Sequence, residues 1–189
     1  MTRALIVIDM QRGFDDLAFW GPTANPECEA NVAALIERWG REGEPIVIVR
    51  HDSPKEGSPL HPSAPGNALV SAVAAVEPDV LVSKSVNSAF YGDPDLQAWL
   101  EERGIRDLVI CGIQTNMCVE TTARMAGNLG YDVTVALDAT RTFDLTGEVA
   151  GVGTVSRTAA ELMAETALVL QQGGFARIVR TADLLKLAL

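Results

Sequence analysis

Short apolar runs alternate along this chain with longer stretches in which apolar residues recur every three or four positions. The runs are five or six residues long, rich in Val and Ile, and apolar on both faces. This is the pattern of parallel strands that are buried on both sides. It predicts six strands, at Ala4–Asp9, Ile46–Arg50, Val80–Lys84, Leu108–Gly112, Val133–Asp138 and Phe175–Val179.

The stretches between the runs have the period of amphipathic helices. In the first of them the apolar residues fall at positions 32, 35, 36 and 39. Another ends at Gly130, and glycine is the usual residue just past a helix C-terminus. We predict four main helices and two shorter ones, at Glu27–Gly43, Pro94–Arg103, Met117–Leu129 and Thr154–Gln172, and at Ala68–Val76 and Thr181–Leu187.

Strand and helix alternate throughout, which predicts an α/β fold. We expect a single doubly wound sheet of about six mainly parallel strands in the order 3-2-1-4-5-6, with helices on both faces. The chain contains no repeat or linker, so residues 1–189 are predicted to form one domain. Two long irregular segments, Gln11–Pro26 and His51–Asn67, follow strands and should lie at the carboxyl edge of the sheet, where such folds bind ligands.

Composition and charge narrow the class of protein. The chain is 48% hydrophobic and 21% charged, has a net charge of −10, and contains three cysteines without a CxxC pair. The acidity argues against a nucleic-acid binder and against a polybasic membrane surface. The cysteine pattern predicts neither a disulfide framework nor a cysteine-type zinc site. Because the chain shows no signal peptide and no membrane-length run, we expect a cytoplasmic location.

Three reactive side chains follow the predicted strands. The first strand ends in Asp9, the third ends in Lys84, and the turn after the fourth carries Cys118. Each alone has an ordinary explanation, as a turn cap, a solvated amine or a small core residue. Together they bring an acid, an amine and a thiol to one edge of the sheet. The other two cysteines are expected to be inert, because Cys28 lies in the first turn of a predicted helix and Cys111 lies within a predicted strand.

These three groups form a working set for acyl transfer. The nucleophile is a thiolate, and both the helix start at Cys118 and the ammonium of Lys84 favour that anion. We therefore expect the pKa of this thiol to lie below its free value of about 8.5. Asp9 can take the thiol proton and return it to a leaving group. The turn "CGIQTNM" would direct backbone N–H groups at the oxyanion.

The predicted strand order sets one geometric condition. The third strand lies two places from the first, which is a separation of roughly 10 Å. A lysine is long enough to span that gap, and an aspartate is not. The sequence therefore predicts that Lys84 reaches across the sheet edge to Asp9.

Three motifs in order resemble the isochorismatase-like cysteine hydrolase family. They are "IVIDMQRGF", "KSVNSAF" and "CGIQTNMCVETTARMAGNLGYDV" followed by "ALDAT", and the similarity runs from Ala4 to the tail "FARIVRTADLL". The resemblance implies a catalytic triad of Asp9, Lys84 and Cys118. It also implies a cis peptide bond between Ile113 and Gln114, with an oxyanion hole formed by the N–H groups of Gln114 and Cys118.

The family resemblance raises the question of a metal. Nicotinamidases of the family bind one through an Asp-x-His pair after the second strand and a further histidine. Here Asp52 is followed two places later by Pro54, and the chain has only two histidines, His51 and His61. We therefore expect no metal and no other cofactor. His61 is expected to be exposed, and His51 to be a structural hydrogen-bonding residue or a substrate contact.

Five residues are candidates for the pocket wall. The aromatic residues Phe14, Trp20 and Phe90 would line the substrate site or pack in the core. Asn87 and Asn116 would bind the substrate or cap turns. The sequence leaves both alternatives open for each of them.

We interpret the chain as a cysteine-dependent hydrolase that cleaves an amide-type C–N bond of a small molecule through a thioester. One alternative is vinyl-ether hydrolysis of the isochorismatase type with Asp9 as the acid. Another is a non-catalytic binding or redox-sensing domain on the same fold. A nucleotide-binding protein is disfavoured because "DMQRGF", and not a glycine-rich turn, follows the first strand. The resemblance also implies a homo-oligomer, a dimer or larger.

Overall fold

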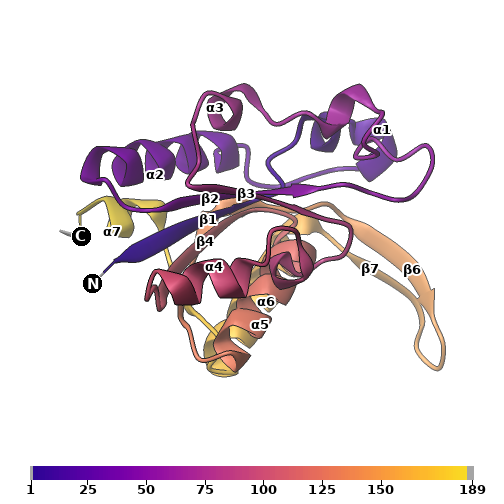
Figure 1. Ribbon diagram of the computed structural model, residues 1–189. Helices are drawn as coiled ribbons and strands as arrows, with labels where there is room; N and C mark the ends of the chain where they lie inside the picture. The colour runs from indigo at the N-terminus through magenta and orange to yellow at the C-terminus, as the bar shows by residue number, and fades with distance from the viewer. Residues whose placement is uncertain (1, 187–189) are drawn as a thin grey trace.

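A six-stranded parallel sheet forms the centre of the protein in the computed structural model, which describes residues 2–186 (Figure 1). The strand order is β3-β2-β1-β4-β5-β8, and every neighbouring pair is parallel. This confirms the predicted doubly wound sheet, with β8 as its sixth strand. The strands are β1 (Arg3–Ile8), β2 (Ile46–His51), β3 (Val80–Lys84), β4 (Asp107–Ile113), β5 (Asp132–Arg141) and β8 (Arg177–Val179).

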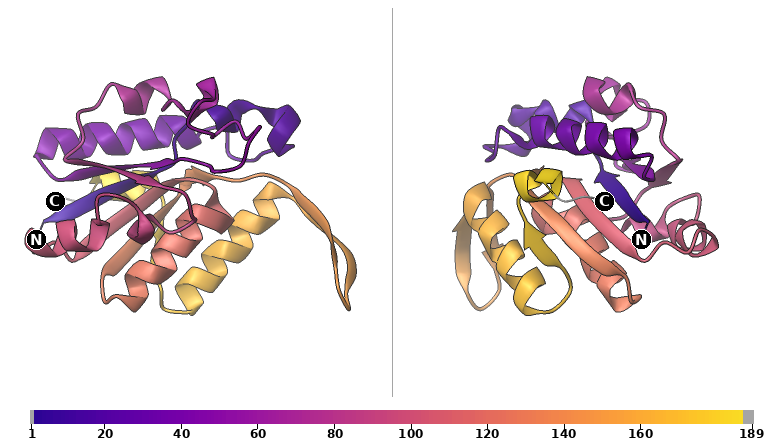
Figure 2. Two further views of the ribbon diagram at one scale, coloured as in Figure 1. Left: turned by 45° about the vertical axis from the view of Figure 1, so that its right-hand side comes forward. Right: turned by 90° about the vertical axis from the view of Figure 1, so that its left-hand side faces the viewer.

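Helices cover both faces of the sheet (Figure 2). One face carries α2 (Cys28–Glu42), α3 (Ser71–Ala74) and α7 (Thr181–Lys186), and the other carries α4 (Leu96–Glu102), α5 (Glu120–Asn128) and α6 (Ala159–Gln172). Side chains of β1 alternate between the two cores, with Ile6 and Ile8 on the α5 face and Leu5 and Val7 on the α2 face. Because successive side chains enter one core or the other and both cores are buried, the strands are apolar at every position.

Local chemistry sets several element boundaries. Helix α2 ends at Gly43, whose φ of 69° is left-handed and suits a residue without Cβ. The side chain of Asp95 caps α4 by accepting a hydrogen bond from the Ala98 N–H. Thr158 and Glu161 form a reciprocal capping box at the start of α6.

That capping box corrects one sequence prediction. The helix expected over Thr154–Gln172 begins at Ala159, and the residues before it form an antiparallel hairpin of β6 (Leu145–Val149) and β7 (Gly153–Arg157). The hairpin was not predicted. Its second strand contains β-branched residues, which favour extended backbone, and Thr158 starts the helix only after them.

The remaining predicted boundaries move by a few residues. The tail helix is present as α7, and its predicted last residue, Leu187, lies outside the described part of the chain. Among residues 2–186, no helix combines the length and the apolar character needed to cross a membrane. The irregular segments contain five short turns of helix, η1 (Arg12–Asp15), α1 (Leu17–Trp20), η2 (Pro65–Asn67), η3 (Ala89–Tyr91) and η4 (Thr115–Val119).

The two long segments meet each other at the carboxyl edge of the sheet. A Cβ on Gly13 would lie 2.8 Å from the Pro59 carbonyl oxygen, and one on Gly66 would lie 2.7 Å from the Gly13 Cα. Backbone therefore packs directly on backbone here, which only glycine allows. This contact fixes the two segments against each other.

Candidate active site

Asp9 stands at the first position after β1. Its backbone N–H donates to the Val49 carbonyl oxygen at 2.9 Å, and its φ of 51° is left-handed. Aspartate tolerates this conformation better than most residues. The turn directs the carboxylate into the protein, where the residue is 0% exposed.

Lys84 reaches the same point from the end of β3. Its Nζ donates to Asp9 Oδ2 at 2.6 Å and lies 3.0 Å from His51 Nδ1 and 3.4 Å from Cys118 Sγ. The two strands stand two places apart in the sheet, as β2 lies between them. The structure thus brings the three predicted residues into one buried cluster, with the ammonium at its centre.

Cys118 lies in η4, the single π-helical turn that joins β4 to α5. The peptide bond between Ile113 and Gln114, where β4 ends, is cis. Asn87 Oδ1 lies 3.9 Å from Cys118 Sγ, and the thiol residue is 7% exposed. Ala89 N–H donates to Thr122 Oγ1 at 3.1 Å, which ties the segment carrying Asn87 to α5.

The charge state of the thiol corrects a sequence prediction. Burial, and secondly the neighbouring Asp9 carboxylate, raise the pKa of the Cys118 thiol to about 12, although the Lys84 ammonium opposes this. The expectation of a pKa below the free value was therefore wrong for the resting site. It counted the ammonium and the helix terminus but not the desolvation. The thiol is protonated at neutral pH until a base removes its proton.

Asp9 has the properties of that base. Burial raises the pKa of its carboxyl above the ordinary value, against the lowering effect of Lys84. Its Oδ2 accepts the hydrogen bond from Lys84, while its Oδ1 is buried and has no hydrogen-bond partner among the described residues. A carboxylate with a raised pKa and one free oxygen is suited to accept a proton.

The candidate pocket residues fall into two groups. Asn87 contacts the thiol, as described above. Asn116 Oδ1 accepts a hydrogen bond from Thr142 Oγ1, so Asn116 joins the turn after β4 to the end of β5. This hydrogen bond is the kind that stabilises a turn. Contact of Asn87 or Asn116 with the substrate stays a prediction.

The aromatic candidates pack in the cores. Phe14 and Trp20 form a cluster with Phe143, with ring centroids 4.9 to 6.0 Å apart. Phe90 packs against Tyr131, at a centroid distance of 5.8 Å, in the same core as Cys118. Packing accounts for the position of Phe90. No pattern in the sequence pointed to Phe143.

Sequence reasoning also missed the residues that hold the segments around the cluster. The buried side chain of Gln11 accepts from the His51 N–H at 2.9 Å and donates to the carbonyl oxygens of His51 and Asn67. Asn67 in turn donates to Asp52 Oδ1 and to the Leu60 carbonyl oxygen. The one signal in the sequence was the position of Gln11, two places after Asp9 and inside the first motif, "IVIDMQRGF".

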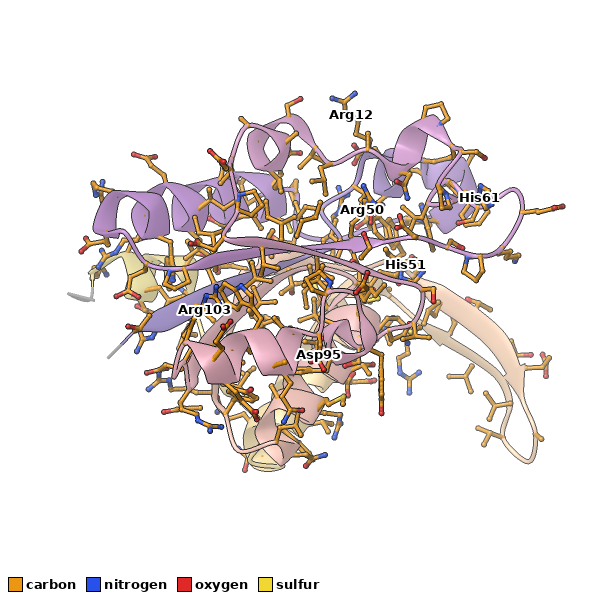
Figure 3. The ribbon with its side chains drawn as sticks, in the orientation of Figure 1. Arg12, Arg50, His51, His61, Asp95 and Arg103 are labelled. Carbon is orange, nitrogen blue, oxygen red and sulfur yellow. The ribbon has the colours of Figure 1, made fainter. Side chains whose placement is uncertain are left out.

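The two histidines differ in their surroundings (Figure 3). His51 ends β2 beside the cluster, and His61 lies on the following segment with its Nδ1 2.7 Å from Ser63 Oγ. One atom each of Asp9, His51 and Cys118 lie within 4.8 Å of one another, a spacing that could hold a metal ion. The Lys84 ammonium already occupies the centre of that group, so a cation there would meet a second positive charge. The donor set fits a lysine better than a metal.

Cavity size does not locate this cluster. A hollow of about 620 Å³ lies between β5, β8 and α6, and its lining contains none of the three cluster residues. A smaller one of about 330 Å³ includes Lys84 in its lining, together with Ser85 and Tyr91. The chemistry of the side chains, rather than the volume of a hollow, identifies the site.

Fold and site together define an α/β protein that holds an acid, an amine and a thiol at the carboxyl edge of a parallel sheet. A family model described as the isochorismatase domain matches residues 3–167. The chain belongs to the isochorismatase family of hydrolases.

Three relatives illustrate the similarity. The isochorismatase family protein YrdC of Bacillus subtilis (strain 168) is 38% identical over 143 residues, which cover 76% of this chain and 75% of that protein. Nicotinamidase 3 of Arabidopsis thaliana is 34% identical over 154 residues, covering 75% and 74%. A crystal structure of an isochorismatase-family protein from Chromobacterium violaceum ATCC 12472 superimposes with a TM-score of 0.88 at 37% identity, covering 97% and 92%.

Proposed function

We propose that this protein is a cysteine-dependent hydrolase that cleaves an amide-type C–N bond of a small molecule through a thioester intermediate. The observation that carries the proposal is the Lys84 ammonium, which lies 2.6 Å from the Asp9 carboxylate and 3.4 Å from the Cys118 sulfur. An acid–base group and a nucleophile joined by one cation are the parts that acyl transfer needs. A relative named as a nicotinamidase supports an amide as the substrate class.

The first half-reaction forms the thioester. Asp9 Oδ1 takes the proton of the Cys118 thiol as its sulfur attacks the carbonyl carbon. The carbonyl oxygen becomes an oxyanion, held by the backbone N–H groups of Gln114 and Cys118. When the C–N bond breaks, Asp9 gives the proton to the departing nitrogen, which leaves as ammonia or an amine. Lys84 stabilises the anionic forms of both partners.

The second half-reaction releases the acid. Water attacks the thioester carbonyl carbon and loses a proton to Asp9. The C–S bond then breaks, the carboxylic acid departs, and the sulfur of Cys118 recovers the proton. Burial raises the pKa of both the Asp9 carboxyl and the Cys118 thiol. One proton passes between the two groups, so the pair cycles between carboxylate with thiol and carboxylic acid with thiolate.

The test measures ammonia release from a panel of small amides and ureides by the wild type and by Cys118→Ala, with and without chelator. The panel holds nicotinamide, carbamoyl-sarcosine, ureidoacrylate, biuret and aliphatic amides. We expect turnover of at least one compound by the wild type, a loss of at least about 10³-fold in Cys118→Ala, and no effect of chelator. Cys28→Ala, which removes a buried thiol outside the cluster, is the matched control. Full activity of Cys118→Ala would exclude covalent catalysis.

A second candidate function is hydrolysis of a vinyl ether with Asp9 as a general acid. The raised pKa of Asp9 favours it, because a carboxyl that keeps its proton to higher pH can protonate an enol ether. This reaction needs no thiol. Turnover of isochorismate by both the wild type and Cys118→Ala, with none by Asp9→Asn, would select it.

We further propose that the protein is a homo-oligomer, a dimer or larger, and that it resides in the cytoplasm. The hairpin of β6 and β7 supports the first point, since it exposes Val149 and Val152 at 48% and 71%. Light scattering on the purified chain measures its mass directly. A monomeric mass at every concentration in a 100-fold dilution series would contradict the assembly.

A further inference from the structure

His51 contacts the catalytic cluster but has no part in the proposed reaction. It pairs with Lys84 across β2 and β3, so the two side chains lie side by side at the end of the sheet. The distance from its Nδ1 to Lys84 Nζ is 3.0 Å. Among the side-chain contacts of the Lys84 ammonium with Asp9, His51 and Cys118, only the ion pair with Asp9 is shorter, at 2.6 Å.

The contact with Lys84 determines which nitrogen of the His51 ring carries the proton. An ammonium has three N–H donors and no acceptor, so Nδ1 must carry the lone pair and the ring proton must be on Nε2. Burial, together with the charge of Lys84, lowers the pKa of the His51 imidazole to about 4. The ring is therefore neutral at physiological pH, and it can accept the hydrogen bond.

The three donors of Lys84 then have three acceptors. They are the carboxylate of Asp9, the imidazole of His51 and the sulfur of Cys118, at 2.6, 3.0 and 3.4 Å. A buried donor without an acceptor is costly, so a full set of acceptors fixes the rotation of the ammonium. The contact to sulfur is the longest of the three, and it is the first that a misplaced ammonium would lose.

The backbone of His51 is fixed as well. Its N–H donates to Gln11 Oε1, and its carbonyl oxygen accepts from Gln11 Nε2 and Asn67 Nδ2. The amide side chains of Gln11 and Asn67 therefore fix the backbone from which the His51 ring extends. Such a second layer of contacts is what positions catalytic groups precisely enough to act.

We propose that His51 is a positioning residue, whose neutral imidazole holds the Lys84 ammonium between Asp9 and Cys118. The proposal rests on the proposed thiol mechanism and adds a fourth side chain to its machinery. The charged or titratable groups that face Lys84 are Asp9 after β1, His51 at the end of β2, Cys118 in η4, and Asp52, which pairs with Arg50 at 3.1 Å. Of these, His51 offers the only uncharged nitrogen acceptor, at 3.0 Å, nearer than the sulfur of Cys118 at 3.4 Å.

The experiment measures the rate of Cys118 alkylation by iodoacetamide as a function of pH, with peptide mapping to separate Cys118 from the other two cysteines. His51→Phe keeps a ring but removes the acceptor. His51→Asn places an amide oxygen near the position of Nδ1. His61→Phe is the matched control, because it changes the same residue type outside the cluster.

We expect His51→Phe to alkylate roughly tenfold more slowly at pH 8, with a rate profile moved to higher pH, since one hydrogen bond to a charged group is lost. His51→Asn should restore the rate to within about twofold, and His61→Phe should match the wild type. Where His51→Phe does not fold, as judged by circular dichroism, His51→Leu replaces it.

Two results would overturn the proposal. A wild-type rate and profile in His51→Phe would mean that the ring only packs. An equal loss in His51→Asn and His51→Phe would mean that the shape of the ring, and not its acceptor, matters. Because alkylation needs no substrate, the result stands apart from the amide panel. Failure of the amide panel leaves this measurement able to support or reject the role of His51.

Discussion

At the scale of single residues, burial controls the chemistry of this site more strongly than charge pairing does. The ammonium of Lys84 opposes the rise in the pKa of Cys118 and of Asp9, yet both rise. Desolvation penalises the charged form of every acid in the cluster. The same effect acts in the opposite direction on His51, whose charged form is the protonated one.

The lowered pKa of His51 predicts that the stability of the protein depends on pH. The pKa of His51 is about 4 in the folded protein and takes its ordinary value of 6.5 when the chain unfolds. Between these values the unfolded chain binds a proton that the folded protein does not. The His51 contribution to stability is therefore fully present above pH 6.5 and falls progressively as the pH drops towards 4.

Urea unfolding of the wild type, His51→Asn and His61→Asn between pH 4.5 and 7.5 checks the sign. We expect the free energy of unfolding to fall less steeply with decreasing pH in His51→Asn than in the wild type. His61→Asn should keep the wild-type slope. A steeper fall in His51→Asn would contradict the depressed pKa.

At the scale of elements, the junction of β1 and β4 aligns the cluster. A Cβ on Gly112 would lie 2.0 Å from the Ile8 carbonyl oxygen, and the φ of Gly112 is 117°. The register between β4 and β5 also shifts between Ile110 and Gly112. The close approach lets Asp9, which follows Ile8, and the turn that follows Gly112 face each other.

Gly112→Ala should therefore disturb both stability and the site. We expect a loss of about 3 kcal/mol in the free energy of unfolding, from the strained backbone and the forced separation of the strands. Gly147→Ala is the control, because its Cβ would meet no atom within 4 Å. It should change stability by less than about 0.5 kcal/mol. Urea unfolding of both variants measures the difference, and equal stabilities would show that β1 and β4 can separate freely.

At the scale of the whole molecule, the hairpin of β6 and β7 stands apart from the layered body. It extends from the side of the molecule that holds the carboxyl edge of the sheet (Figure 2). All residues of β6 are exposed, and β6 and β7 form a sheet of their own. An isolated two-stranded hairpin adds little to stability in water.

Replacing residues 147–155 with Asn-Gly tests this independence. The replacement leaves Thr146 and Ser156, which are paired in the hairpin, joined by a favoured two-residue turn. At a protein concentration at which the chain is monomeric, we expect the free energy of unfolding to change by less than about 0.5 kcal/mol, because no buried apolar surface is removed from the body. A loss of about 2 kcal/mol or more would mean that the hairpin stabilises the protein, and light scattering would show whether it does so by assembly.

The sequence by itself determined the six strands of the main sheet, their order and the three side chains that meet at its carboxyl edge. These follow from local patterns: continuous apolar runs of five or six residues, helical stretches between them, and the rule that parallel strands deliver their ends to one edge. The reach of Lys84 across β2 followed from the same order and the length of its side chain.

Only the tertiary structure decided the hairpin, the contact of His51 with Lys84 and the charge state of Cys118. Thr154 and Val155 suit a strand or the first turn of a helix, and pairing with β6 makes the choice. The pKa of Cys118 depends on how completely its neighbours exclude water, and those neighbours come from β1, β3 and α5. Periodicity is a property of adjacent residues, whereas desolvation is a sum over everything that packs around a group.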